Sequence, residues 1–263
     1  MVALILLALA LASTSAWASA RGFSPAPATT ALGTPASLTV TADVADVQVR
    51  SSDEVDQVTL ALVEDGADEL PAPGTEVRAR LSQQGGSADP VLDVRQPHRF
   101  STLPWGPGSL DLLLLVPTGH TLSLDLTTEV GGIRAEGDFA ALAVRSDVGD
   151  IRLSSLSAPG GLVAHSEVGE LDIELGAPAA ATIDVTAGVG DVALQLPADA
   201  GGAVSVTSEV GEIDITAPGS GTWDIDASSE LGTTEVDPSL RGTAQDIGSI
   251  TATSEVGDVH LHR

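Results

Sequence analysis

A sevenfold repeat with a glycine at a fixed place constrains this sequence more than any other feature. Each copy reads close to T/S-E/D-V-G-D/E-I/V-x-I/L, and successive glycines lie 18, 20, 21, 21, 21 and 25 residues apart. A period near 20 residues indicates stacked structural units that bury their apolar faces against one another. The seven glycines are Gly131, Gly149, Gly169, Gly190, Gly211, Gly232 and Gly257.

Apolar residues alternate with polar ones on both sides of each glycine. In the third copy, Leu162 and Val168 precede Gly169 on the same phase, and Leu171 follows it. A period of two is typical of a strand with one buried face, so the sequence predicts that these side chains face one interior. The residue before each glycine, valine in six copies and Leu231 in one, is therefore expected to be buried. A glycine between two such strands is explained if the chain turns there with a positive φ.

A serine stands three positions before most of these glycines. It falls on the inward phase beside the corner, where we expect its hydroxyl group to bond to the backbone and not to act as a nucleophile. These serines are Ser146, Ser166, Ser208, Ser229 and Ser254.

Turn-forming clusters separate the copies, for example SAPGG at 157–161 and APGSG at 217–221. Each unit is then a strand, a glycine corner, a second strand and a loop. Stacked in register, such units predict an all-β fold, a β-solenoid of parallel two-strand turns with about 20–21 residues per repeat over residues 122–263. We expect the stack to stop at the last strand, VHLHR, where His260 and His262 share one face of a solvated terminal strand and are not expected to form a metal site.

Residues 37–121 are expected to form a first turn and an irregular, more antiparallel β-rich part that caps the stack. The run SLTVTADVADVQV at 37–49 copies the repeat, with Ala45 in place of the glycine. Strand-like runs at 55–63, 75–82, 90–96 and 109–117 break the period and are separated by polar loops. The run from Leu112 to Val116 is apolar on both faces, so it should be the most buried strand of this part.

The N-terminal segment predicts a location outside the cytoplasm. Residues 2–12 are continuously apolar, and Ala18-Ser19-Ala20 is a suitable cleavage site, so residues 1–20 are either a signal peptide or a retained membrane anchor. Residues 21–36, rich in Pro, Ala and Thr, are interpreted as a flexible linker. The membrane is expected to be contacted only through this N-terminal segment.

The repeat, following a β-rich start and one N-terminal apolar segment, resembles the bacterial putative-adhesin family of DUF4097-type β-strand-repeat proteins over roughly residues 37–263. The resemblance implies an envelope-associated, surface-exposed β-solenoid. It brings no catalytic residues with it, because the shared pattern describes a fold.

Composition limits the partners. The chain carries 37 acidic and 11 basic residues, a formal net charge of −26, which disfavours nucleic acid and anionic lipid. Aromatic residues make up 2%, too few for an extended sugar-binding platform, and Trp105 and Trp223 are interpreted as partly buried structural residues. Arg134, Arg145 and Arg152 are the one local basic group in the repeats, and no nucleophile, zinc or phosphate-binding motif occurs.

Carboxylates flank the corner in most copies, two positions before the glycine and one position after it. Two interpretations stay open: a row of Ca²⁺ sites, because hard oxygen ligands suit this cation, or a solubilising acidic ridge that opposes lateral aggregation. The spacing matches no known calcium loop, and we favour the ridge, with no cofactor. The candidate cation ligands are Asp147, Asp150, Glu167, Glu170, Glu209 and Glu212.

Three classes of function remain. We favour a non-enzymatic surface protein of the cell envelope, an adhesin or structural interaction module whose partner is a protein or another envelope component. A sensing or regulatory protein of the envelope stress response is the alternative. A carbohydrate-active β-helix enzyme ranks last, because it would need clustered acid, base and aromatic residues in a groove.

Overall fold

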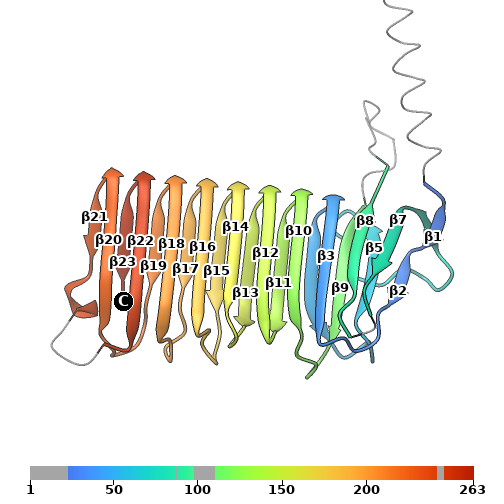
Figure 1. Ribbon diagram of the computed structural model, residues 1–263, viewed down its shortest axis with the longest axis horizontal. Helices are drawn as coiled ribbons and strands as arrows, with labels where there is room; N and C mark the ends of the chain where they lie inside the picture. The colour runs from blue at the N-terminus through green and yellow to red at the C-terminus, as the bar shows by residue number, and fades with distance from the viewer. Residues whose placement is uncertain (1–22, 87, 98–109, 242–245) are drawn as a thin grey trace, which may run out of the picture.

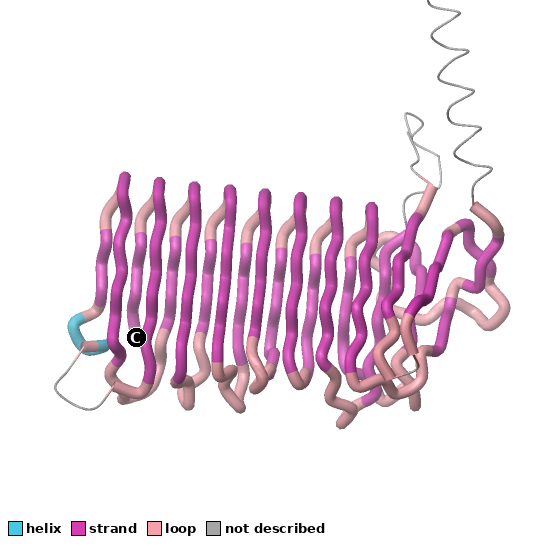
Figure 2. Tube along the Cα trace, in the orientation of Figure 1, coloured by secondary structure: helices cyan, strands magenta, loops and turns pink. Residues whose placement is uncertain are grey.

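The protein is an elongated solenoid, and each turn of the solenoid is built from β-strands. A computed structural model describes residues 23–86, 88–97, 110–241 and 246–263. Regular structure in these residues is β-strand apart from one 3-10 helix, η1 (Pro238–Leu240), and they contain no helix that is long and apolar enough to cross a bilayer. Figure 1 and Figure 2 show the strands standing side by side along one axis. The predicted all-β solenoid is confirmed; residues 1–20, His98 and Trp105 lie outside the described residues.

Two sheets run along the stack, and the core lies between them. The long-strand sheet contains, in spatial order, β7 (Arg80–Gln84), β8 (Val91–Arg95), β3 (Ser37–Val44), β10 (Ser123–Val130), β12 (Ala141–Val148), β14 (Leu162–Val168), β16 (Thr182–Val189), β18 (Gly202–Val210), β22 (Gly248–Val256) and β20 (Trp223–Leu231). The short-strand sheet contains β2 (Thr29–Ala31), β5 (Thr59–Glu64), β9 (Leu110–Pro117), β4 (Val47–Ser52), β11 (Ile133–Asp138), β13 (Ile151–Ser157), β15 (Leu171–Leu175), β17 (Val192–Gln195), β19 (Ile213–Thr216), β23 (Val259–His262) and β21 (Thr234–Val236). A separate antiparallel pair joins β1 (Pro25–Pro27) to β6 (Glu76–Arg78).

Each regular turn places one strand in each sheet and joins them at a glycine corner. In the turn of β12 and β13, Leu142 and Val144 face the core from one sheet, and Ile151 and Leu153 face it from the other. Parallel pairing puts equivalent residues of neighbouring turns in register, for example Leu142 with Leu162. Burying each such aliphatic side chain stabilises the fold by roughly 1.5–3 kcal/mol before the entropy of ordering the chain is subtracted.

The N-terminal end closes with antiparallel strands. Strands β8 and β9 add one more parallel turn beyond β3 and β4, so the segment 37–49 is the second turn of the stack and not its end. Beyond that turn, β7 pairs antiparallel with β8, and β5 pairs antiparallel with β9. Residues Leu112 to Val116 are buried on both faces, as predicted, because Leu113 and Leu115 pack with Ala61 and Val63 in a second, smaller core.

The prediction that residues 21–36 form a flexible linker is wrong for the residues of this segment that the structure describes. Strand β1 pairs with β6, and β2 pairs antiparallel with β5. Its composition suggested a linker, but Ala28 and Leu32 are buried and contribute to the cap. Proline is tolerated in β1 because the strand lies at an edge, where one side of the backbone needs no ladder partner.

The C-terminal end of the stack is not formed by the C-terminal strand. Strand β22 lies between β18 and β20, and β23 lies between β19 and β21. The turn of residues 223–236 therefore lies outermost. The turn that follows it in sequence, formed by β22 and β23, lies between it and the turn of β18 and β19. The expectation that VHLHR ends the stack is wrong, and His260 and His262 lie on an internal strand.

Polarity explains this exchange of order. The outermost turn carries Thr234 where the other copies carry Ile, Leu or Val, and Thr234 is exposed. The inserted turn carries Ile250, Val259 and Leu261, all of which are buried. The more apolar turn is thus covered on both sides. The cap over the open end includes buried Leu240 of η1.

We predict that Leu261→Ala destabilises the fold by about 2–5 kcal/mol, because it empties a site enclosed by two neighbouring turns. Val236→Ala, at the equivalent position of the outermost turn, should cost roughly 1 kcal/mol or less because Val236 is only half-buried. Chemical denaturation of both variants measures the difference. A cost for Val236→Ala equal to or above that for Leu261→Ala would contradict the inserted position of β23.

Candidate functional site along the corner edge

The corners of eight turns form one continuous edge of the molecule, which we call the corner edge. It lies where the arrowheads of the long strands end in Figure 1. At Gly169, φ is +152°, and an added Cβ would lie 2.3 Å from the carbonyl oxygen of Gly149 in the preceding turn. Only glycine fits this approach without moving the backbone. The inserted turn follows the same rule, since a Cβ on Gly257 would lie 2.0 Å from the Gly211 oxygen.

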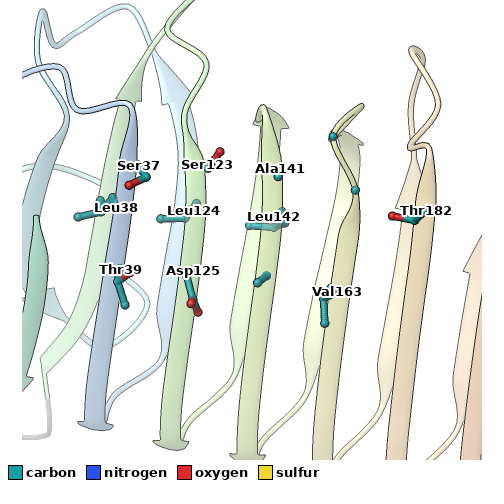
Figure 3. Close-up of a pocket in the computed structure, with 13 residues that line it drawn as sticks. Ser37, Leu38, Thr39, Ser123, Leu124, Asp125, Ala141, Leu142, Val163 and Thr182 are labelled. Carbon is teal, nitrogen blue, oxygen red and sulfur yellow. The ribbon is translucent and has the colours of Figure 1, made fainter. Parts of the chain in front are cut away.

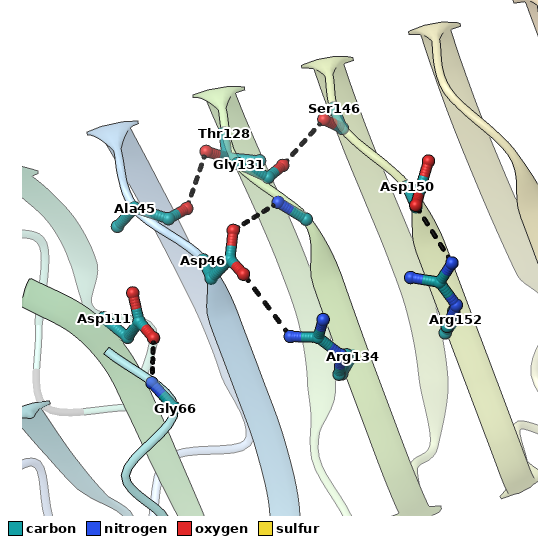
Figure 4. Close-up of polar contacts among 11 residues, drawn as sticks. Ala45, Asp46, Gly66, Asp111, Thr128, Gly131, Arg134, Ser146, Asp150 and Arg152 are labelled. Atoms are coloured by element: carbon teal, nitrogen blue, oxygen red, sulfur yellow. Dashed lines mark hydrogen bonds and ion pairs between the residues drawn. The ribbon is translucent and has the colours of Figure 1, made fainter. Parts of the chain in front are cut away.

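A layer of hydroxyl groups closes the interior just inside the corner, as predicted. Ser146 Oγ donates to the carbonyl oxygen of Gly131 at 3.0 Å, and Thr128 Oγ1 donates to that of Ala45 at 3.2 Å (Figure 4). Ser166, Ser229 and Ser254 make the equivalent bonds. Ser208 differs, because its buried hydroxyl has no hydrogen-bond partner among the described residues. Four of the five serines thus bond to the backbone of a neighbouring turn, as predicted.

The residue before each glycine points outward, so the prediction that it is buried is wrong. The six valines at this position in the repeats are 42–49% exposed, and Leu231 is 70% exposed. Their phase along the strand is inward, but the interior ends at the hydroxyl layer and leaves no room beyond it. We call the stacked row the valine ridge; it consists of Val44, Val130, Val148, Val168, Val189, Val210, Val256 and Leu231.

Carboxylates form two rims, one on each side of the valine ridge. The long-strand rim contains Asp43, Glu129, Asp147, Glu167, Glu209, Glu255 and Glu230. The short-strand rim contains Asp46, Asp150, Glu170, Asp191, Glu212 and Asp258.

Aspartates of the short-strand rim bind the backbone of the neighbouring turn. Asp46 Oδ1 accepts the N–H of Gly132 at 2.8 Å, which Figure 4 shows, and Asp191 Oδ1 accepts that of Glu212 at 2.8 Å. Asp150 and Asp258 do the same. In stack order, aspartate therefore occupies every second turn, and each one bonds to the turn that follows. The alternation does not appear in sequence order, because the last two turns of the sequence stand in the reverse order in the stack.

The six candidate calcium ligands are distributed along both rims. Asp147 and Glu167 share Arg145, at 3.3 Å and 2.5 Å. Asp150 accepts the N–H of Glu170 and pairs with Arg152 at 3.0 Å. Glu209 is exposed at the end of β18, and Glu212 lies 3.6 Å from His260 Nε2. Among the described residues, no group of three or more His, Asp or Glu is arranged to hold a metal ion.

Two adjoining shallow hollows lie on the outer face of the long-strand sheet. One, of about 310 Å³, is lined mainly by Ser, Thr, Ala and Leu, with Asp125 as its one charged residue (Figure 3). The other, of the same volume, is lined by Asp125, Arg145, His165 and Asp184 among others. Neither lining contains an aromatic residue, and Arg145 is already paired with two carboxylates. Trp223, interpreted above as a partly buried structural residue, is buried.

Among the aspartates with shifted pKa values, Asp258 and Asp111 differ in direction and cause. The backbone N–H and then the hydroxyl of Thr233, at 2.7 and 2.8 Å, lower the pKa of Asp258. Burial raises the pKa of Asp111, and the N–H of Gly66 at 2.9 Å (Figure 4) opposes that change. Asp258 is thus a carboxylate whose ionised form stabilises the contact between two turns.

Fold and edge together define a parallel β-solenoid of two-strand turns with a stacked glycine corner. The family model described as Toastrack DUF4097 matches residues 118–262, more than half of the sequence, and the chain belongs to this family. No curated protein matches the chain.

Two solved structures are similar to this chain. A putative adhesin from Bacteroides fragilis is 15% identical with a TM-score of 0.52, over 89% of this chain and 95% of its own. This likeness shows a shared fold. A putative cell adhesion protein from Clostridium sporogenes is 12% identical with a TM-score of 0.35, over 91% of this chain and 99% of its own.

We predict that Gly169→Ala destabilises the fold by about 2 kcal/mol or more, because the positive φ and the contact with Gly149 both oppose a Cβ. Gly86→Ala is the matched control, since Gly86 has ordinary φ and open space around its Cα, and it should be nearly neutral. Thermal melting of both variants provides the comparison. Equal melting temperatures would show that the corner does not need glycine.

We predict that Asp258→Asn destabilises the fold at pH 7 and that the difference from the unchanged chain disappears in acid. The folded pKa of Asp258 lies below its usual value of 3.8, so its stabilisation is present above that value and is lost as the pH falls through the folded pKa. Asp199→Asn, in an exposed loop, controls for the loss of one negative charge. Denaturation from pH 7 to pH 2.5 gives the profile; a difference that stays constant would refute the assignment.

Proposed function

We propose that this protein is a non-enzymatic surface module of the cell envelope that presents its rigid corner edge to a binding partner. One observation carries the proposal: eight stacked turns repeat the same aliphatic position, exposed in seven of them, between two rows of carboxylates. A face repeated in register over the whole stack suits binding to an extended partner better than it suits chemistry at one point.

Several properties support a binding role over catalysis. Arg134, Arg145 and Arg152 each pair with a carboxylate, so this basic group is neutralised within the fold. The hollows on the long-strand sheet lack the aromatic residues of a sugar subsite. The shared fold with a putative adhesin from Bacteroides fragilis is consistent with a role at the surface. The net charge of −26 disfavours nucleic acid and anionic lipid as partners.

Export would follow from the N-terminal segment. Residues 2–12 are continuously apolar, and a small-residue cleavage site follows at Ala18-Ser19-Ala20. In our proposal this segment takes the chain out of the cytoplasm, either as a cleaved signal or as a retained anchor, and the membrane is contacted through no other part.

Labelling of intact cells tests the location. An antibody raised against residues 118–262 should label intact cells of the native host as strongly as permeabilised ones, whereas a cytoplasmic control protein should be labelled only after permeabilisation. A chain that lacks residues 2–20 should lose the label on intact cells, because it is no longer exported. Labelling of the full chain only after permeabilisation would refute a surface role.

A further inference from the structure

The valine ridge concentrates the exposed apolar surface of the molecule. Ten large apolar residues are exposed among the described residues, and seven of them belong to this one row. Single exposed apolar residues are ordinary on protein surfaces, but contiguous apolar patches of more than a few hundred Å² mark interaction sites. The other three, Val91, Val163 and Ile247, lie at other positions of the fold and form no row.

Strand propensity does not explain the row. β-Branched residues are favoured in strands, and threonine meets that preference on a solvated face. On the same long strands, the outward row three residues before the ridge residue has threonine in five turns, namely Thr41, Thr127, Thr186, Thr207 and Thr253. The valine ridge therefore carries apolar surface that the strands themselves do not require.

The carboxylate rims restrict which partner fits the ridge. A partner must offer an apolar stripe with positive charge on both of its sides, since the rims run along both sides of the valines. A second copy of this chain would bring carboxylates against carboxylates, each chain having a net charge of −26. Anionic lipid is repelled for the same reason.

The dimensions of the edge fit an α-helix. Packed sheets lie about 10 Å apart, which matches the width of a helix with its side chains, about 10–12 Å. Eight rungs at about 4.8 Å span about 34 Å, the length of a helix of about 22 residues. The apolar stripe of a helix repeats every 3.5 residues, or about 5.3 Å, which is close to the spacing of about 4.8 Å between rungs. Over the whole ridge the two repeats therefore shift relative to each other by less than one rung.

We infer that the valine ridge is a docking site for a partner-protein helix whose apolar stripe is flanked on both sides by lysine or arginine. The apolar stripe covers the valines, and the basic side chains reach the two carboxylate rims. This inference deepens the proposed binding role and rests on it. It is tested with purified protein, so its failure would be distinguishable from a failure of the surface location.

A designed peptide serves as the probe. It has 22 residues, with leucine at the a and d positions and lysine at e and g. One control peptide has the same composition in scrambled order, and a second has glutamate in place of lysine. The scrambled peptide matters because a chain with a net charge of −26 attracts any polycation. Binding to the full chain is measured by titration calorimetry at 150 mM salt.

Two matched variants of the full chain locate the binding. Val148→Thr/Val168→Thr/Val189→Thr removes three apolar groups from the ridge. Val91→Thr/Val163→Thr/Ile247→Thr removes three that are equally exposed elsewhere. All six sites are exposed, so both variants should fold, and thermal melting checks this. The ridge variant should bind the lysine peptide at least tenfold more weakly, and the control variant should bind it as the unchanged chain does.

Specific results would overturn the inference. It fails if the two variants bind equally, or if the scrambled peptide binds as tightly as the designed one, since either result means general attraction of a polycation. It also fails if the unchanged chain forms a dimer in sedimentation that the ridge variant does not form, because the ridge would then join two copies. Binding of phosphatidylcholine vesicles that is lost only in the ridge variant would assign the ridge to lipid instead.

Discussion

Close backbone contact between the corner glycines sets the geometry on which the rest of the solenoid depends. The N–H of Gly149 donates to the Val168 oxygen at 2.9 Å, with no Cβ between the turns. The same contact brings the serine layer within reach of the glycine carbonyl groups and ends the interior there. The next side chain has no core left to enter. The exposure of the valine row is thus a consequence of one tight corner repeated in register.

Much of the fold could be predicted from the sequence because local patterns encode it. Alternation at Leu142, Val144 and Ile151 identifies the inward face, and the glycine period identifies the stack. The neighbours of each turn are not encoded in this way. All copies carry nearly the same apolar pattern, so any turn can pack on any other, and only the polarity of Thr234 favours the open end for residues 223–236.

The candidate site was predicted in part. The sequence predicts the carboxylates, but it wrongly predicts that Val168 is buried. The alternation of inward and outward side chains along a strand does not indicate where the interior ends. The hydrogen bonds of Asp46 and Asp191 depend on contacts between turns, which require the stack order. They also show how the rims reduce mutual repulsion, since backbone N–H groups of the next turn offset part of the carboxylate charge.

An edge that is apolar along its centre and acidic along both sides is a recognition surface only if the valines face water. The chain has no cysteine, so a single thiol reports this directly. The Val168→Cys variant should react with a maleimide reagent in the native state nearly as fast as in denaturant. The Ser166→Cys variant, two residues away in the buried hydroxyl layer, should be protected until the chain unfolds. Protection at position 168 equal to that at 166 would contradict the outward ridge.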